Sequence, residues 1–270
     1  MRNSRAFTLI ELLVVVVIIA LLAAMVILVV GPFQRKAQMV QATANMKQLA
    51  TGFLNYTGSH DGELPPLGEA QPQWGPAAEE MKEAWYNSVT VLAGGRSLSS
   101  FQVHDEFYNK NNLLFIPSAK YPKDKNAKPY FAVSMNEKLY PKAAKSGPTG
   151  DAPVSVRRQS MLLDSKTVVF FESGLPGEKP LPGQHAYFGK ASGWAPDIAA
   201  RYNATESTSA TDRGNDKTLI LFGDGHVDSL PAKAVIAPGG GAYFPQVDPT
   251  AATAGSVSWT LDPDTNPNGN

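Results

Sequence analysis

An unbroken run of uncharged apolar residues near the amino terminus constrains this chain more than any other feature. Residues 12–30 are nineteen such residues in a row. As an α-helix they would be about 28 Å long at ~1.5 Å per residue, close to the thickness of the hydrocarbon core of a bilayer. The run therefore predicts a membrane-crossing helix.

Glu11 is the unusual residue of this region, because its carboxylate lies directly before the apolar run. A charged side chain at such a depth costs on the order of a few kcal/mol unless it lies near the interface or finds a partner. A glutamate kept in this position indicates that the carboxylate has a function.

The residues around Glu11 resemble the processing signal of type IV prepilins and type II secretion pseudopilins. The matching stretch is residues 5–15, Arg-Ala-Phe-Thr-Leu-Ile-Glu-Leu-Leu-Val-Val, which follows a short basic leader. The resemblance implies that a prepilin peptidase/N-methyltransferase cuts between Ala6 and Phe7 and methylates the new amino terminus, and that Glu11 serves assembly. Family members usually have Gly before the cut, and Ala6 is the next smallest residue.

The resemblance also implies a location. The leader would lie in the cytoplasm, the helix in the bacterial cytoplasmic membrane, and the rest on the periplasmic or extracellular side. There the protein would meet other pilin-like subunits and an assembly platform in the cytoplasmic membrane. Charge alone does not set this orientation, because basic residues flank the run on both sides.

Other amino-terminal segments fit less well. A secretory signal peptide has an apolar core of about 7–15 residues followed by a cleavage site, whereas this run is longer and continues into Gly-Pro-Phe-Gln. A lipoprotein signal needs a Cys, and the chain has none. An uncleaved anchor stays open as an alternative, although it gives no reason for Glu11 or for the order Phe-Thr-Leu-Ile-Glu.

Composition narrows the function further. Basic and acidic residues both total 24, and loss of the leader with Arg2 and Arg5 leaves 22 against 24, a net charge of −2. Nucleic-acid binding needs a basic excess, so no nucleic-acid partner is expected. The absence of Cys excludes disulfides and thiolate chemistry. No nucleophile with a matching base and orienting group stands out, so the sequence does not indicate an enzyme.

The apolar helix is expected to continue as an amphipathic spine. An apolar stripe steps by three and four residues, the helical period: Met39, Ala42, Met46, Leu49, Phe53 and Tyr56. The opposite face is polar, with Arg35, Gln38, Gln41, Asn45 and Gln48. Gly31 and Pro32 predict a kink rather than a stop, and Thr57-Gly58 should end a helix that begins near Phe7.

Beyond the spine, frequent Gly and Pro predict a loop-rich head. Runs of β-branched and aromatic residues predict strands over residues 113–118, 130–136, 167–172 and 218–222, with a short return strand over 226–228. A short helix is expected over residues 79–92, with Met81, Trp85, Val89 and Leu92 facing inward. Residues 141–153 and 174–216 should be loops.

Together these elements predict an α+β fold of the pilin-like kind, in which one long helix packs on an antiparallel sheet. The expected parts are a leader over 1–6, a transmembrane helix over 7–30, an amphipathic continuation over 31–56, an extracytoplasmic head over 57–230 and a loop-rich tail over 231–270. One strand is expected in the tail, near Trp259.

A turn motif is the most specific feature of the head. Gly223, Asp224 and Gly225 should form a tight turn that leads into His226. Phe-x-Asp-Gly-His-Val resembles the hallmark of a large group of prepilin-like proteins. Those proteins also carry Cys-Pro-Ser before an aromatic-rich strand, and a His ten positions before the Asp. Here Ile116 stands in place of that Cys, and Gly214 in place of that His.

Two acidic clusters raise the question of a metal ion. Asp61 and Glu63 follow the spine, and some pseudopilins bind calcium through loops. Asp224, His226 and Asp228 could hold a cation, since alternate residues of a strand share a face. At both places a plain turn is the competing and favoured interpretation, and no other cofactor is expected.

The leading hypothesis is a structural subunit that waits in the membrane and then enters a filament, either a type II secretion pseudopilus or a type IV pilus. There Glu11 would meet the positive amino terminus of Phe7 on an adjacent subunit. The alternative is a membrane-anchored binding module that recognises a glycan or another envelope component without polymerising. Exposed Trp74, Trp194 or Trp259 would favour it.

Overall fold

The computed structural model describes residues 8–68, 82–101, 104–121, 129–136, 139, 165–175, 178, 198–202, 216–235 and 257–258. Within them it describes the backbone but not the side chains of residues 26–30, 32, 104–105 and 232–233. The leader, Phe7 and the tryptophans at 74, 194 and 259 lie outside the described residues. The same holds for Gly214, for the predicted loop over 141–153, for the greater part of the loop over 174–216 and for much of the tail.

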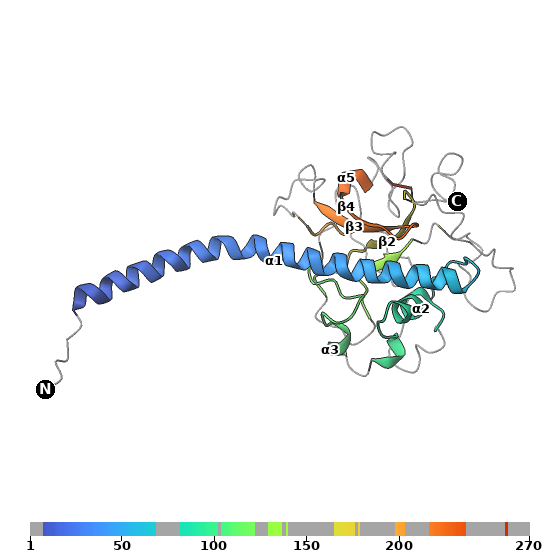
Figure 1. Ribbon diagram of the computed structural model, residues 1–270, viewed down its shortest axis with the longest axis horizontal. Helices are drawn as coiled ribbons and strands as arrows, with labels where there is room; N and C mark the ends of the chain where they lie inside the picture. Colours follow the sequence, from blue (N-terminus) through green and yellow to red (C-terminus); the bar gives the residue numbers. More distant parts are fainter. Residues whose placement is uncertain are drawn as a thin grey trace.

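A long helix, α1 (Leu9–Ser59), forms the spine of the molecule (Figure 1). It continues through Gly31 and Pro32 without a break and curves along its length. Its amino-terminal half projects away from the head, and its other half runs through the head. α1 ends at Ser59, beyond the expected end at Tyr56, because Gly58 and Ser59 still take helical positions. Asp61 (φ 53°) and Gly62 (φ 79°) then turn the chain.

The predicted apolar stripe is confirmed as the face of α1 that packs into the head. Met39 is partly buried and the rest of the stripe is buried: Ala42, Met46, Leu49, Phe53 and Tyr56. Asn45, which is expected on the polar face opposite the stripe, is also buried, so that prediction is wrong. Its Nδ2 donates to the carbonyl oxygen of Phe115 at 2.9 Å and of Asn112 at 3.4 Å, and the amide thereby ties α1 to a loop of the head.

Four strands form an antiparallel sheet in the order β1-β2-β3-β4. They are β1 (Val133–Met135), β2 (Val168–Glu172), β3 (Lys217–Phe222) and β4 (Val227–Pro231). The strands predicted over 130–136, 167–172, 218–222 and 226–228 are thus confirmed in position, with β4 running on to Pro231. A long helix packed on an antiparallel sheet is a mixed α+β architecture, consistent with a pilin-like fold.

The sheet is buried on both faces. On one face Leu219 and Leu221 of β3 join the stripe of α1 in one apolar cluster. On the other face Ile220 and Phe222 pack with Val235 of α5 (Ala232–Val235) in a second cluster. Successive side chains of a strand point to opposite faces, so the continuous apolar run of β3 supplies both clusters. Figure 1 shows α1 and α5 on opposite sides of the sheet.

A small helical layer covers the side of α1 that faces away from the sheet (Figure 1). It consists of α2 (Trp85–Leu92), the short 3-10 helix η2 (Leu98–Ser100) and α3 (His104–Phe107). α1 therefore lies between the sheet and this layer. The close contact of α1 with α2 depends on Gly52, because a Cβ at that position would overlap the carbonyl oxygen of Val89.

The helix predicted over residues 79–92 starts later than expected. Residues 82–84 form a turn and a bend, and 79–81, including Met81, lie outside the described residues. Trp85 and Val89 are buried as predicted, but Leu92 is 39% exposed, so its inward placement is wrong. Tyr86 and Thr90 are buried instead. The face by which α2 packs is therefore rotated from the predicted one, toward these two residues.

The strand predicted over residues 113–118 is wrong, because these residues form turns. Several of their backbone groups bond to side chains rather than to a neighbouring strand. The N–H of Leu114 donates to Asn112 Oδ1 at 3.1 Å, and the N–H of Ile116 donates to the Tyr121 hydroxyl at 2.9 Å. An apolar segment buried in this way shows the same sequence pattern as a short core strand.

Candidate functional site

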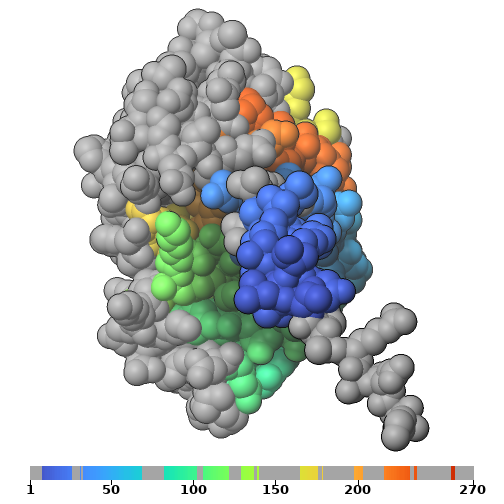
Figure 2. All heavy atoms as spheres, turned by 90° about the vertical axis from the view of Figure 1, so that its left-hand side faces the viewer, coloured from blue at the N-terminus to red at the C-terminus, as the bar shows by residue number. Residues whose placement is uncertain are grey.

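The amino-terminal part of α1 carries apolar side chains that the head does not cover. Every large one is between 46% and 80% exposed: Leu9, Ile10, Leu12, Leu13, Val14, Val15, Val16, Val17, Ile18, Ile19, Leu21, Leu22 and Met25. Because they are nearly consecutive, they surround the helix on all sides. Figure 2 looks along α1 from this end and shows its side chains in front of the head. A continuous apolar surface of this size marks a contact site for protein or lipid.

Within the part of the chain that the structure describes, no helix is both long and apolar enough to cross a membrane. The predicted span runs to Val30, and the side chains of residues 26–30 lie outside the described residues. The transmembrane helix over 7–30 therefore stays a prediction.

Thr8 and Glu11 form a capping box at the start of α1. The N–H of Glu11 donates to Thr8 Oγ1 at 3.3 Å, while Glu11 Oε2 accepts from the Thr8 N–H at 2.9 Å and from the Thr8 hydroxyl at 2.7 Å. These bonds satisfy N–H groups that the start of a helix leaves without a partner. The Thr-x-x-Glu spacing is a sequence signal for this cap, and an interpretation based on charge and depth misses it. Glu11 thus has a structural role within its own chain.

A second exposed surface runs along the head-bearing half of α1 and is named here the outer face of α1. Its members are all exposed and follow one another at alternating steps of four and three: Phe33, Ala37, Val40, Ala44, Lys47, Thr51, Leu54 and Gly58. Phe33 and Val40 are 67% and 62% exposed. This spacing is that of a helix–helix seam, with apolar and small residues in line with the exposed amino-terminal part.

The predicted turn of the Asp-Gly-His motif is confirmed between β3 and β4. Gly225 has φ 88°, and its N–H donates to the carbonyl oxygen of Phe222 at 2.9 Å. Asp224 Oδ1 accepts from the N–H of His226 at 3.0 Å and lies 2.6 Å from His226 Nδ1. The His226 ring stacks on Phe222, with ring centroids 4.3 Å apart. Each member of the motif thus has a role in the turn.

The two acidic residues of this region, Asp224 and Asp228, each accept local hydrogen bonds. Desolvation raises the pKa of Asp224, but hydrogen bonds from the backbone and ring of His226 outweigh it and leave that pKa below its usual value. Asp228 is exposed on β4, where its Oδ1 accepts from the N–H of Ser229 at 2.7 Å. Among the described residues, no group of three or more His, Cys, Asp or Glu side chains is placed to hold a metal ion.

Asp61 and Glu63 lie in the turn that follows α1. The N–H of Gly62 donates to the carbonyl oxygen of Thr57 at 2.7 Å, and that of Glu63 to the carbonyl oxygen of His60 at 2.9 Å. These backbone bonds and the positive φ angles of Asp61 and Gly62 support the turn interpretation. Calcium binding by Asp61 and Glu63 stays a prediction.

A buried charged network at one end of the sheet is a feature that the sequence did not suggest. The side chain of Glu172 is 0% exposed and that of Arg201 only 6%. Arg201 donates to Glu178 through Nε at 3.0 Å and Nη2 at 2.6 Å, and the Tyr202 hydroxyl donates to Glu172 Oε1 at 2.7 Å. The only signal in the sequence is Glu172 at the end of an apolar strand, since its partners come from distant segments.

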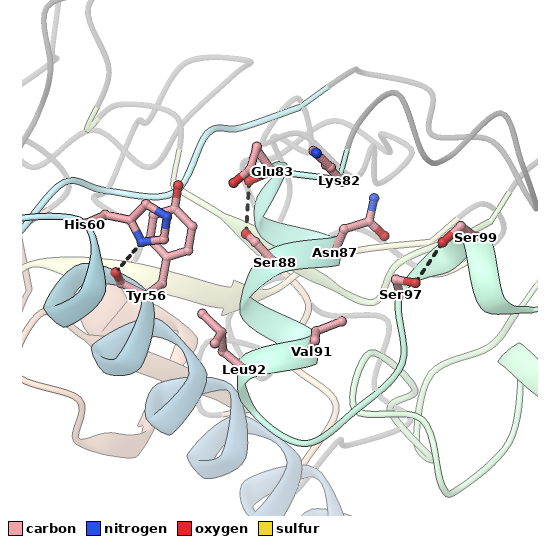
Figure 3. Close-up of a pocket in the computed structure, with 10 residues that line it drawn as sticks. All are labelled: Tyr56, His60, Lys82, Glu83, Asn87, Ser88, Val91, Leu92, Ser97 and Ser99. Carbon is pink, nitrogen blue, oxygen red and sulfur yellow. Dashed lines mark hydrogen bonds between the residues drawn. The ribbon is translucent and has the colours of Figure 1, made fainter.

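The head also has a shallow cavity of about 430 Å³ beside α2 (Figure 3). The end of α1 contributes Tyr56 and His60, whose rings stack 3.9 Å apart, and α2 and its flanking turns contribute most of the rest. The other lining residues are mostly polar: Lys82, Glu83, Asn87, Ser88, Val91, Leu92, Ser97 and Ser99. The arrangement contains binding groups of both charge signs and an exposed ring.

Comparison with known proteins bears on the amino-terminal end. Residues 1–27 match the family model described as the prokaryotic N-terminal methylation motif. Neither a curated protein nor a solved structure matches the chain. The match stops well before the Asp-Gly-His turn, so the resemblance of that turn to one group of prepilin-like proteins stays a prediction. The first 27 residues of this chain are a type IV prepilin-like signal.

Proposed function

We propose that this chain is a pilin-like structural subunit that assembles into a type II secretion pseudopilus or a type IV pilus-like filament. A prepilin peptidase would remove residues 1–6 and methylate Phe7. The observation that carries the proposal is the exposed apolar part of α1, which lies within the residues that match a methylation motif and projects from a folded head. Such a helix supports assembly rather than catalysis.

The exposed part of α1 needs two successive environments in this proposal. Before assembly the helix would lie in the cytoplasmic membrane, with the leader in the cytoplasm and the head outside. An assembly platform in that membrane would then move the subunit into the filament, where neighbouring helices replace lipid around the same side chains. Packing between helices can do this because close contacts compensate for the lipid contacts that are lost.

The outer face of α1 supports assembly into a filament over a simple anchor. A lone anchor needs apolar residues only in the membrane, yet Phe33 and Val40 are exposed beyond residue 30. Ala37 and Ala44 lie between them and are small enough to let another helix approach closely. In the filament this seam would extend the contact from the membrane-spanning part into the head.

Glu11 would have two tasks in the filament. In its own chain it caps α1 through Thr8. Toward an adjacent subunit, its carboxylate would pair with the amino terminus that cleavage creates at Phe7. A charge left without its partner in an apolar core costs several kcal/mol. The two tasks call for different chemistry, because capping needs an acceptor oxygen whereas charge pairing needs the negative charge.

Two substitutions separate these tasks. Glu11→Gln keeps an acceptor for Thr8 but removes the charge, and Thr8→Ala weakens the cap but keeps the charge. The proposal predicts that Thr8→Ala still enters filaments, while Glu11→Gln and Glu11→Val insert into the membrane but stay there. Shearing the cells and probing the released fraction measures assembly. Normal filaments from Glu11→Gln would remove the charge-pairing argument.

Cleavage itself is tested separately by mass spectrometry of the mature amino terminus. The expected product begins with methylated Phe7. A mature protein that keeps Met1 to Ala6 would contradict the proposal, because no new amino terminus would then exist to pair with Glu11.

A second candidate function is a membrane-anchored binding module that does not polymerise. The cavity beside α2 favours it, because polar groups and the exposed ring of His60 suit a polar ligand such as a glycan. In this case shearing would release nothing, and the Glu11 variants would behave like the wild type.

A further inference from the structure

A short segment of the head, residues 198–202, lies across one end of the sheet and is named here the strap. It pairs with the end of β2 through the Ser173–Ile198 bridge and with the start of β3 through the Tyr202–Lys217 bridge. Its backbone bonds are the N–H of Ala199 to the carbonyl of Glu172 at 2.9 Å, and two bonds between Tyr202 and Lys217 at 2.7 and 3.2 Å. The strap therefore connects the two neighbouring strands β2 and β3 at the same end of the sheet.

The side chain of Arg201 in the strap faces two carboxylates, the buried Glu172 and the partly buried Glu178. Arg201 binds Glu178 with two hydrogen bonds and donates through Nη2 to the carbonyl oxygen of Ser173 at 2.7 Å. Its Nη1 lies 4.0 Å from Glu172 Oε1, too far for a hydrogen bond, and makes none within the described residues. Arg201 is thus hydrogen-bonded to Glu178 rather than to Glu172, and ionised Glu172 would be a second negative charge beside one cation.

Burial favours the neutral form of Glu172 and outweighs the groups that face its carboxylate. Tyr202 donates its hydroxyl to Glu172 Oε1, and the N–H of Leu219 donates to Oε2 at 3.3 Å. Burial raises the pKa of Glu172 to about 7, although the charge of Arg201 and these two hydrogen bonds lower it. Burial also raises the pKa of Tyr202 and of Tyr121, and that of Arg201 is raised by the two glutamates despite burial, so these groups do not titrate near neutrality.

We propose that Glu172 is a proton-binding switch that sets how firmly the strap is held on the sheet. With its proton bound, the network contains one positive and one negative charge, and the strap stays paired with β2 and β3. When the proton leaves, a second negative charge remains on a side chain that is fully buried. Opening the strap relieves this cost, because water then reaches the carboxylate.

The sign of the effect follows from the direction of the shift. The folded protein holds the proton of Glu172 more tightly than the open form does, in which the pKa returns to its ordinary value of 4.5. The contribution of Glu172 to the protection of the strap from hydrogen exchange is therefore fully present below pH 4.5, is lost as the pH rises toward 7, and changes little above that. Glu178 does not oppose this trend between pH 6 and 8, because Arg201 overcomes the effect of burial and keeps its pKa below the usual value.

Hydrogen exchange of the full chain in detergent tests the proposal. The amides of Ala199, Tyr202 and Lys217 should lose about tenfold in protection between pH 6 and pH 8, after correction for the intrinsic exchange rate. In Glu172→Gln, which keeps oxygen and shape but cannot ionise, protection should not change with pH.

Glu178→Gln gives a second test of the proposal. Arg201 then has Glu172 as its carboxylate partner, so the loss of protection between pH 6 and 8 should shrink. If Glu172→Gln does not fold, carboxyl carbon NMR of the wild type decides, because Glu172 should titrate near neutrality. Flat protection in the wild type, equal loss in Glu172→Gln, or titration of Glu172 at an ordinary acidic pH would each overturn the proposal.

Discussion

A Cβ atom added to Gly225 would come within 2.8 Å of Cδ1 of Leu54, so the turn between β3 and β4 rests directly on α1. The Asp-Gly-His turn therefore does more than reverse the chain. It places a backbone without a side chain against α1, and the absence of a Cβ at Gly225 permits that approach.

Gly225→Ala should destabilise the head by about 1–2 kcal/mol, since a non-glycine residue in the left-handed region costs about that much. The contact with Leu54 adds to the cost, although the end of a leucine side chain can move. Chemical denaturation of the full chain in detergent measures the loss. In a Leu54→Ala background, Gly225→Ala should cost only the free energy of the left-handed backbone conformation, because the contact with Leu54 is absent. An unchanged stability of Gly225→Ala would contradict the close approach.

Gly52→Ala should cost more than Gly225→Ala. The new Cβ would meet the backbone carbonyl of Val89 and lie 2.8 Å from the Cβ of Ala93, and a helix backbone cannot move as cheaply as a side-chain end. We expect a loss of about 3 kcal/mol, at the upper end for overpacking. Gly58→Ala is the matched control, because nothing lies within 4 Å of its added Cβ. It should gain about 0.5 kcal/mol from helix propensity.

The head should lose stability in acid through Glu178. Burial raises its pKa, but Arg201 and the N–H groups of Lys120 and Leu175 more than compensate, so the folded pKa lies below the ordinary value. A carboxylate of this kind stabilises the fold above its unfolded pKa near 4.5, and the contribution is lost as the pH falls further. Denaturation midpoints measured from pH 4.5 down to pH 3 should therefore fall in the wild type.

Glu178→Gln should show a shallower decline over the same range and a lower stability at pH 6, where Arg201 has lost its bidentate partner. An identical acid response in the two proteins would show that other carboxylates cause it.

Ala6→Gly should speed processing. Prepilins that the processing signal resembles usually have Gly before the cut, and Ala6 is one methyl group larger. The fraction of cleaved protein after a fixed time, measured by mass spectrometry, should rise for Ala6→Gly and fall for the bulkier Ala6→Leu. Equal processing of all three proteins would mean that the residue before the cut does not limit the reaction.

The sequence predicted those parts of the fold that depend on periodicity. The stripe from Met39 to Tyr56 repeats over many turns of one helix, and β3 has a long run of strand-forming residues. Asn45 was misplaced because an amide that bonds to buried carbonyls cannot be told from an exposed amide by its type. The strand at 113–118 failed for a related reason, since side-chain hydrogen bonds satisfy that apolar run.

The candidate sites also divide into those that follow a local sequence rule and those that do not. Thr8 and Glu11 are three residues apart, and their capping box follows a local rule. The turn at Gly225 was equally local and was predicted correctly. Glu172 and Arg201 are brought together by the packing of distant segments, and neither residue carries a local signal of the other. Such a network becomes visible only when the strands and the strap are placed.

The continuity of α1 from Leu9 to Ser59 has a mechanical consequence. No loop separates the uncovered amino-terminal part of α1 from the part that packs between the sheet and α2. The backbone hydrogen bonds of the helix can therefore transmit a rotation or a pull from the uncovered part to the head. A neighbour that binds residues 9–25 would therefore also choose the direction in which the head faces. Orientation and attachment would be decided in a single contact.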